Sequence, residues 1–185
     1  MITFVYANPT NGSYCHSILS ACTDTLTQLG RDYQVIDLYA DDFNPILTAD
    51  NISGTAPTDP LVESYITMLQ RTDKIIFIFP IWWGNMPAIL KGFFDKTFVK
   101  GRIYDVDSAT GAILPMLSVP SSMIVTTSGG AAAPNASFVS DTMVNDILAP
   151  VGITGTIWHD CDHVDTISPA AREAFTATIV KSLAE

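Results

Sequence analysis

The first candidate site is a polar loop that follows the apolar segment Ile2–Ala7. It leads directly into a helix-forming segment and contains Asn8, Thr10, Asn11, Gly12, Ser13 and Tyr14. Free backbone N–H groups, small hydroxyls and the positive end of a helix favour binding of a phosphate. The loop lacks the lysine and spacing of a P-loop and has no GxGxxG pattern, so it does not indicate a nucleoside triphosphate or Rossmann site. Ser13 as an ordinary helix N-cap is the alternative interpretation.

The second candidate site holds two adjacent tryptophans, Trp82 and Trp83, after a strongly apolar run that ends at Pro80-Ile81. Neighbouring side chains on a strand point to opposite faces, so both rings cannot fill one core. We expect one ring to pack against the next helix and the other to line a pocket for a flat ring. Gly84 would let the backbone approach that ligand. Simple packing of the pair is the alternative.

The third candidate site is the run Thr126-Thr127-Ser128-Gly129-Gly130. Its hydroxyls and unobstructed N–H groups could hydrogen-bond the polar edge of a heterocycle, and the alternative is a flexible turn. A phosphate at the first loop, a flat ring at the second and polar edge contacts at the third together describe a flavin nucleotide. The combination is more informative than any one loop.

Alternating apolar and helical patterns should position these loops at strand ends. Expected strands cover Ile2–Ala7, Tyr33–Leu38, Lys74–Pro80, Ser122–Thr127 and Thr154–His159. Expected helices cover a segment ending at Gly30, then Asp59–Arg71, Met86–Phe98, Ser137–Leu148 and Pro169–Ala184. Residues 40–58 and 99–118 are expected to be long irregular connections.

The strand–helix alternation predicts one α/β domain spanning residues 1–185, a three-layer sandwich around a five-stranded parallel sheet. Lys74–Pro80 is apolar without alternation, which is typical of a strand buried on both faces. Right-handed crossovers favour the flavodoxin-like strand order 2-1-3-4-5. In such sheets ligands bind beyond the carboxyl ends of the strands, where all three candidate loops are expected.

These motifs resemble those of the flavodoxin-like NAD(P)H:quinone oxidoreductases, the family that includes modulator-of-drug-activity-like flavoproteins. PIWWGNMPAILKGFFDKTF is similar to the family signature, and ANPTNGSYC is similar to its phosphate loop. GRIYD resembles the connection before the fourth strand, and TTSGG resembles the family's TTGG. The resemblance covers roughly residues 1–130, and PIWWGNMPAILKGFFDKTF is the motif specific to the family.

The resemblance implies a bound flavin, with FMN as the first choice and FAD as the close alternative. It implies a phosphate site at Asn8, Ser13, Tyr14 and Cys15, a ring site at Pro80, Ile81, Trp82, Trp83 and Gly84, and edge contacts from Thr127, Ser128, Gly129 and Gly130. Cys15 stands where the family usually has asparagine, and Asn8 where many members have histidine. These departures put contacts to a second phosphate in question.

The implied reaction is ping-pong, in which NADH or NADPH donates hydride and a quinone, azo or nitro acceptor takes two electrons. Trp82 and Trp83 would shape the flavin pocket and provide stacking surfaces, and Tyr104 would help to form the acceptor pocket. No side chain is assigned as an acid–base catalyst. The resemblance also implies a homodimer. A flavin-binding ancillary subunit of a transporter such as a potassium-efflux system and a flavodoxin-type electron carrier are the alternatives. The MPAILKG helix start argues against the carrier.

The composition argues against several other functional classes, including nucleic-acid-binding and membrane proteins. Nine Lys and Arg against nineteen Asp and Glu give a net charge of −10, which disfavours nucleic-acid binding. Lys91, Lys96, Lys100 and Arg102 form one local basic group, expected on a surface helix. No apolar run is long enough to span a bilayer and no signal peptide is recognised, so a cytoplasmic protein with reduced cysteines is expected.

A metal site is one interpretation of the group His159, Cys161 and His163. Alternate strand residues share a face, but zinc sites need further ligands in a defined geometry, and this spacing matches no standard pattern. We expect no metal there and instead an acidic loop at the end of an outer strand.

Overall fold

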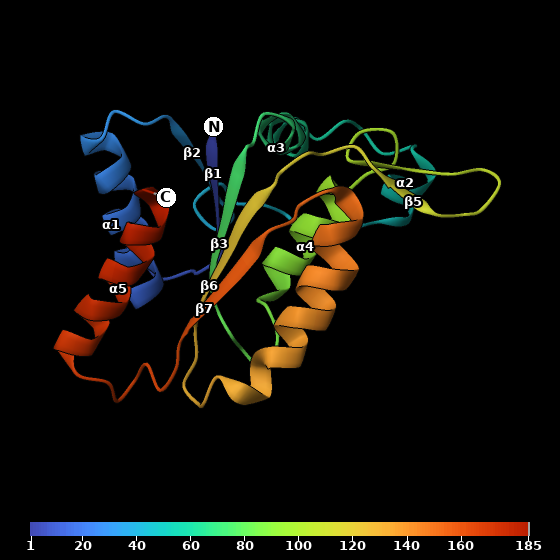
Figure 1. Ribbon diagram of the computed structural model, residues 1–185. Coiled ribbons are helices and arrows are strands. Elements are labelled where there is room, and N and C mark those ends of the chain that lie inside the picture. Colours follow the sequence, from blue (N-terminus) through green and yellow to red (C-terminus); the bar gives the residue numbers. More distant parts are fainter. Residues whose placement is uncertain (185) are drawn as a thin grey trace.

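A five-stranded parallel sheet forms the centre of the molecule, in the order β2-β1-β3-β6-β7 (Figure 1). The structure is a computed structural model that describes residues 1–184. The strands are β1 (Ile2–Tyr6), β2 (Tyr33–Asp37), β3 (Lys74–Pro80), β6 (Ser121–Thr127) and β7 (Thr156–Cys161). Counted within this sheet alone, the order is the predicted 2-1-3-4-5, so the predicted topology is confirmed.

Helices cover both faces of the sheet. One face carries α1 (Tyr14–Gln28) and α5 (Pro169–Ala184), and the other carries α3 (Pro60–Gln70), α4 (Ala88–Thr97) and the wide helix η2 (Phe138–Leu148) (Figure 1). Short 3₁₀ turns, η1 (Ala133–Asn135) and η3 (Ala149–Val151), flank η2. The sandwich therefore has the three predicted layers.

Strand β3 shows why its sequence has no polar alternation. Ile76 and Ile78 pack into the core beneath α1 and α5, whereas Ile75, Phe77 and Phe79 pack into the core beneath α3 and α4. All five side chains are fully buried. Burial on both faces, as expected for a central parallel strand, is confirmed.

Three helices start one or two residues later than predicted, because the residues at the predicted starts lie outside the helix, whereas α5 begins at Pro169 as predicted. The Asp59 carboxylate accepts hydrogen bonds from the N–H groups of Leu61 and Val62 at 3.1 and 3.4 Å, and the helix proper begins at Pro60. Pro87 likewise precedes α4, whose first residue is Ala88. Aspartate is common at the N-cap and proline at the first helical position, as in Asp59-Pro60.

The two connections expected to be irregular contain regular structure. The first holds α2 (Ala49–Ser53), closed at its start by a capping box between Thr48 and Asn51 and at its end by Gly54 at φ 73°. The second forms an antiparallel hairpin of β4 (Tyr104–Val106) and β5 (Ile113–Pro115). These elements are too short to produce a recognisable hydrophobic period, so composition alone suggested loops.

The fifth sheet strand is displaced toward the C-terminus relative to the prediction. It runs over Thr156–Cys161 instead of Thr154–His159, so Asp160 and Cys161 belong to the strand and not to an acidic loop. Asp160 pairs in register with Thr126 of β6. Within residues 1–184, no helix combines the length and apolarity that a bilayer crossing requires.

Candidate active site

Three loops meet at the carboxyl ends of β1, β3 and β6, at the lower end of the sheet in Figure 1. They are residues 7–13 (the first loop), 81–87 (the second loop) and 128–132 (the third loop). The Ile81 N–H donates to the Thr127 carbonyl at 2.9 Å, and the Ala7 N–H donates to the Ile78 carbonyl at 3.1 Å. The parallel order thus brings together the three segments that the sequence predicted.

The first loop combines a helix cap with free N–H groups. Ser13 is the N-cap of α1, and its hydroxyl accepts from the His16 N–H at 3.2 Å. The Asn8 side-chain oxygen accepts from the Thr10 N–H at 2.9 Å, which holds the turn. The N–H groups of Tyr14 and Cys15 donate to no other residue in the described part of the chain. Both interpretations of this loop are therefore compatible, because the cap leaves two donors free at the positive end of a 15-residue helix.

The side chains of Tyr14 and Cys15 point away from this open end. The Tyr14 hydroxyl donates to the Arg172 carbonyl of α5 at 2.6 Å. The Cys15 thiol is buried 3.3 Å from Thr127 Oγ1, and burial raises its pKa. These two residues can offer a ligand their backbone N–H groups, while the buried thiol links the first loop to β6.

The second loop is a tight turn that lifts both tryptophans off the core. Trp82 and Asn85 exchange backbone hydrogen bonds of 3.0 Å in each direction. The central residues, Trp83 at φ 53° and Gly84 at φ 70°, are both left-handed, as in a type I′ turn. Trp83 is fully exposed and Trp82 is 43% exposed. The expectation that one ring packs inward is wrong, because the turn begins immediately after the buried strand ends.

The third loop is held by residues at the end of β7. The Ser128 N–H donates to the Cys161 carbonyl at 3.1 Å, and the Val164 N–H donates to the Ser128 carbonyl at 2.9 Å. Thr127 and Ser128 are buried, whereas Gly129 and Gly130 are exposed. Within residues 1–184 the N–H groups of both glycines have no acceptor. The loop is an ordered segment that presents two free donors.

Asp160 is the site residue that sequence reasoning missed. Its carboxylate oxygens accept hydrogen bonds from the hydroxyls of Thr126 at 2.6 Å and Ser128 at 2.7 Å. Burial raises the pKa of Asp160, and the two hydroxyls partly oppose that increase. The clue in the sequence was the hydroxyl-rich third loop, but the pairing depends on the register of β6 with β7.

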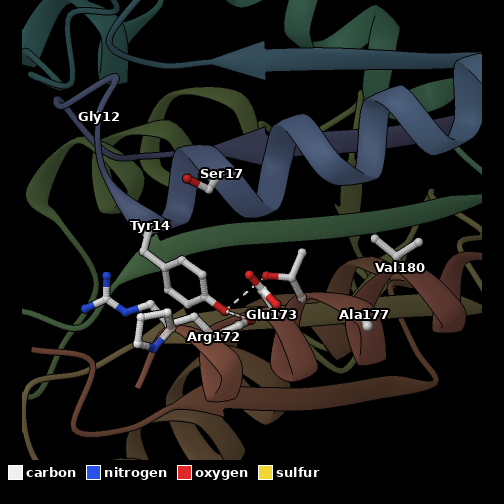
Figure 2. A pocket seen from close by; sticks show the side chains of 9 residues that line it. Gly12, Tyr14, Ser17, Arg172, Glu173, Ala177 and Val180 are labelled. Atoms are coloured by element: carbon white, nitrogen blue, oxygen red, sulfur yellow. Dashed lines mark hydrogen bonds between the residues drawn. The ribbon is translucent and has the colours of Figure 1, made fainter. Parts of the chain in front are cut away.

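A cavity of about 540 Å³ opens between α1 and α5, next to the first loop (Figure 2). Figure 2 shows Tyr14 at the start of α1 directed across toward Arg172 and Glu173 of α5. The Arg172 guanidinium lies 5.5 Å from the centre of the Tyr14 ring. The lining residues are Gly12, Tyr14, Ser17, Pro169, Arg172, Glu173, Thr176, Ala177 and Val180. The cavity offers a cation, hydroxyls and apolar surface, and it does not include the tryptophans.

The structure does not bring Tyr104 to this cluster. Tyr104 lies in the β4–β5 hairpin, at the end of the molecule opposite the three loops (Figure 1). It lines a separate cavity of about 290 Å³ together with Phe94 and Phe98. Within one chain Tyr104 therefore cannot shape a pocket at the second loop.

The local basic group is neutralised by acidic partners. Lys91 pairs with Asp95 at 2.5 Å, Lys96 with Asp59 at 3.2 Å, Lys100 with Asp105 at 3.9 Å and Arg102 with Glu63 at 2.9 Å. Lys96 is buried and not on the surface as expected. The region around α4 thus gives no positive patch.

Among residues 1–184, no three His, Cys, Asp or Glu side chains are grouped closely enough to hold a metal ion. The thiols of Cys15, Cys22 and Cys161 are free and buried.

Comparison with known proteins places these features in a wider context. The sequence matches, over residues 1–183, a family described by its flavodoxin-like fold. A mouse ribosyldihydronicotinamide dehydrogenase [quinone] (Mus musculus) is 31% identical over 125 residues, which cover 57% of this chain and 54% of that protein. The chain therefore spans about half the length of the curated relatives it matches.

Solved structures match over nearly the whole chain. Smu.1420 from Streptococcus mutans has a TM-score of 0.83 at 28% identity, covering 97% of this chain and 96% of that one. An NAD(P)H:quinone oxidoreductase from Methanothermobacter marburgensis has a TM-score of 0.84 at 23% identity, covering 98% and 95%. An FMN-dependent NADH-azoreductase from Bacillus anthracis, solved with FMN, has a TM-score of 0.76 at 15% identity, covering 99% and 96%. The last two structures show that this chain shares their fold.

Proposed function

We propose, from the premise that this chain belongs to the family with the flavodoxin-like fold, that it is a flavin-dependent NAD(P)H oxidoreductase acting on a quinone or similar acceptor. One observation supports this most strongly. Three features meet at the carboxyl ends of three neighbouring strands. They are the free N–H groups at the start of α1, two exposed tryptophans, and the free N–H groups of Gly129 and Gly130. Ligands of open α/β sheets bind at such a position.

The chemistry of each loop fits one part of a flavin. We assign the phosphate to the N–H groups of Tyr14 and Cys15, where the helix end favours negative charge. We assign the flat ring to the surface of Trp82 and Trp83 beside Gly84. Gly129 would donate to the polar edge of the ring, as would Gly130, and such donors stabilise negative charge on the reduced ring.

A bound flavin would supply the redox chemistry of hydride and two-electron transfer between NADH or NADPH and an acceptor, for which we propose a ping-pong order. The residues of this chain bind and orient it. The exposed Trp83 ring offers a stacking surface. The Cys15 thiol at the start of α1 is buried, and burial raises its pKa, so it stays protonated and we assign it no acid–base role.

The cavity between α1 and α5 bears on the choice between FMN and FAD. FMN ends at its single phosphate and would leave this cavity empty. The adenosine half of FAD needs a volume of the size found here, which lies within the range of about 300–1,000 Å³ typical of ligand pockets. Arg172 offers a cation for a second phosphate, and Thr176 and Ala177 offer polar and apolar contacts for a nucleoside. This cavity supports FAD as a candidate beside FMN, the first choice from the sequence resemblance.

Purification followed by cofactor analysis tests this function. The protein should be yellow, or should take up FMN or FAD when the apoprotein is titrated, and mass spectrometry of the released cofactor should identify which. Oxidation of NADH and NADPH should then be followed with and without a soluble quinone. A protein that binds neither flavin would overturn the proposal. A flavin-bound protein that oxidises neither nucleotide would indicate the carrier or the ancillary subunit instead.

A further inference from the structure

The third loop depends on one carboxylate from the neighbouring strand. Asp160 stands directly beside Thr126 in the register of β6 and β7. Thr126 and Ser128 are two residues apart, and both hydroxyls donate to Asp160, one to each oxygen. Trp158 completes the arrangement by donating from Nε1 to Thr126 Oγ1 at 2.9 Å.

Ser128 is consequently fixed at three atoms. Its N–H is bound by the Cys161 carbonyl, its carbonyl by the Val164 N–H and its hydroxyl by Asp160. All three partners belong to β7 or to the segment that follows it. Gly129 and Gly130 follow without side chains, and the Gly130 carbonyl accepts from the His163 N–H at 3.2 Å and lies 3.0 Å from the Ser128 hydroxyl. The direction of their free N–H groups therefore depends on Ser128 together with the segment after β7.

Holding two hydroxyls with a half-buried carboxylate costs free energy, because burial disfavours the charged form of Asp160. A neutral side chain could satisfy part of the same pattern at lower cost. An ionised carboxylate accepts one hydroxyl at each oxygen, whereas an asparagine side chain would place an NH2 donor at one of the two positions, and hydrogen bonds to a charged group are roughly twice as strong as neutral ones. The carboxylate also places a negative charge just behind the loop that would meet the polar edge of the ring.

We propose that Asp160 is a positioning residue, which orients the N–H groups of Gly129 and Gly130 through Ser128 and places a negative charge behind the ring site. This inference rests on the proposed flavin function for its consequence, but the positioning itself is a property of the chain. Asp160 contacts no ligand directly and acts through the third loop.

The test compares Asp160→Asn with Asp162→Asn. Both changes remove one negative charge from the same segment, but Asp162 has no hydrogen-bonded hydroxyl partner among the described residues. In the protein without flavin, amide hydrogen exchange of residues 127–133 should become at least several-fold faster in the Asp160→Asn variant and stay unchanged in the Asp162→Asn variant. Equal exchange in the wild type and the Asp160→Asn variant would overturn the proposal whether or not a flavin binds.

With FMN or FAD, the Asp160→Asn variant should bind the flavin about tenfold more weakly, equivalent to about 1.4 kcal/mol. Its flavin midpoint potential should shift to more positive values, because a negative charge that opposes reduction is removed. Asp160→Glu, which keeps the charge, should return the potential toward the wild-type value even where affinity stays reduced. Unchanged affinity and potential in the Asp160→Asn variant would contradict the proposal. Failure of the wild type to bind flavin would instead refute the proposed function.

Discussion

Trp83 occupies a backbone conformation that is costly for its side chain. A φ of 53° is rare for a bulky residue and costs about 1–2 kcal/mol relative to a right-handed conformation. The ring gains no burial in return, since it is fully exposed. Under the proposed function, the flavin would cover this strained and exposed aromatic residue.

Replacement of Trp83 by asparagine separates stability from binding. Trp83→Asn places the Asn-Gly pair that type I′ turns prefer, so the free energy of unfolding without flavin should increase by about 1 kcal/mol. Flavin affinity should fall by about tenfold or more because the stacking surface is lost. Urea unfolding and flavin titration measure the two effects. Ile52→Asn, at another exposed apolar residue, serves as the control and should leave flavin affinity unchanged. If the Trp83→Asn variant binds flavin as tightly as the wild type, the Trp83 ring does not contribute to flavin binding.

Asp160 should also produce a pH dependence of stability. Its folded-state pKa is raised by burial, so the folded protein holds this proton more tightly than the unfolded chain does. Its stabilising contribution is therefore complete below the unfolded pKa of about 3.9 and is lost as pH rises through the folded value. The stability of the Asp160→Asn variant relative to the wild type should increase from about pH 4 toward neutrality, as measured by urea unfolding of the flavin-free proteins. A relative stability that decreases over this interval would show that the hydroxyl bonds outweigh the desolvation cost.

At the scale of elements, α4 is joined to the preceding connection by a close contact at Gly92. A Cβ added to Gly92 would lie 2.3 Å from Pro45 Cβ and 2.4 Å from the Pro45 carbonyl oxygen. The buried Lys96 strengthens the same contact, because its ammonium group donates to the Asn44 carbonyl at 2.9 Å. The helix that follows the tryptophan turn is thus packed directly against residues 44–45.

Gly92→Ala should force these elements apart. Overpacking of this kind costs about 1–3 kcal/mol, and thermal or urea unfolding should show a loss in that range. Gly12→Ala is the matched control, since a Cβ there meets nothing within 4 Å and its stability should change by less than about 1 kcal/mol. Equal stability of the Gly92→Ala variant and the wild type would mean that Pro45 moves freely.

At the scale of the whole molecule, the net charge of −10 is not offset by a positive patch around α4. Anionic NADH and NADPH should therefore be repelled at long range. Under the proposed function, kcat/KM for NADPH should rise about two- to fivefold between low salt and about 0.15 M, where the Debye length is about 8 Å. NADH, which carries less charge, should respond less. A kcat/KM that falls with salt would reveal attractive steering that the charge distribution does not indicate.

The exposed apolar side chains support the dimer implied by the sequence resemblance. Trp83 lies at the carboxyl ends of the strands, whereas Ile113, Leu114 and Met116 lie on or beside the hairpin at the opposite end. Both groups are exposed in the single chain, and a second copy could cover them. Light scattering after size-exclusion chromatography should give twice the 20.0 kDa of one chain. A monomer at micromolar concentration would contradict this prediction.

The sequence by itself determined the sheet, its strand order and the three loops that meet at one edge. Lys74–Pro80 is apolar at every position because both faces are buried, and the other strands alternate with helices at recognisable periods. These are local patterns, and right-handed crossovers leave few ways to connect them. The positions of Ser13, Trp83 and Gly130 in loops at the carboxyl ends of the strands could therefore be predicted without coordinates.

Only the tertiary structure decided where the side chains in those loops point. The link from Asp160 to Ser128 joins residues 32 positions apart and depends on the register of two strands. The outward direction of both tryptophans depends on two left-handed residues in one turn, and the distance of Tyr104 from the loops depends on the path of the hairpin. Hydrophobic periodicity specifies which face of an element is buried, but it carries no information about polar pairs between elements, because those are set by the packing of the whole chain.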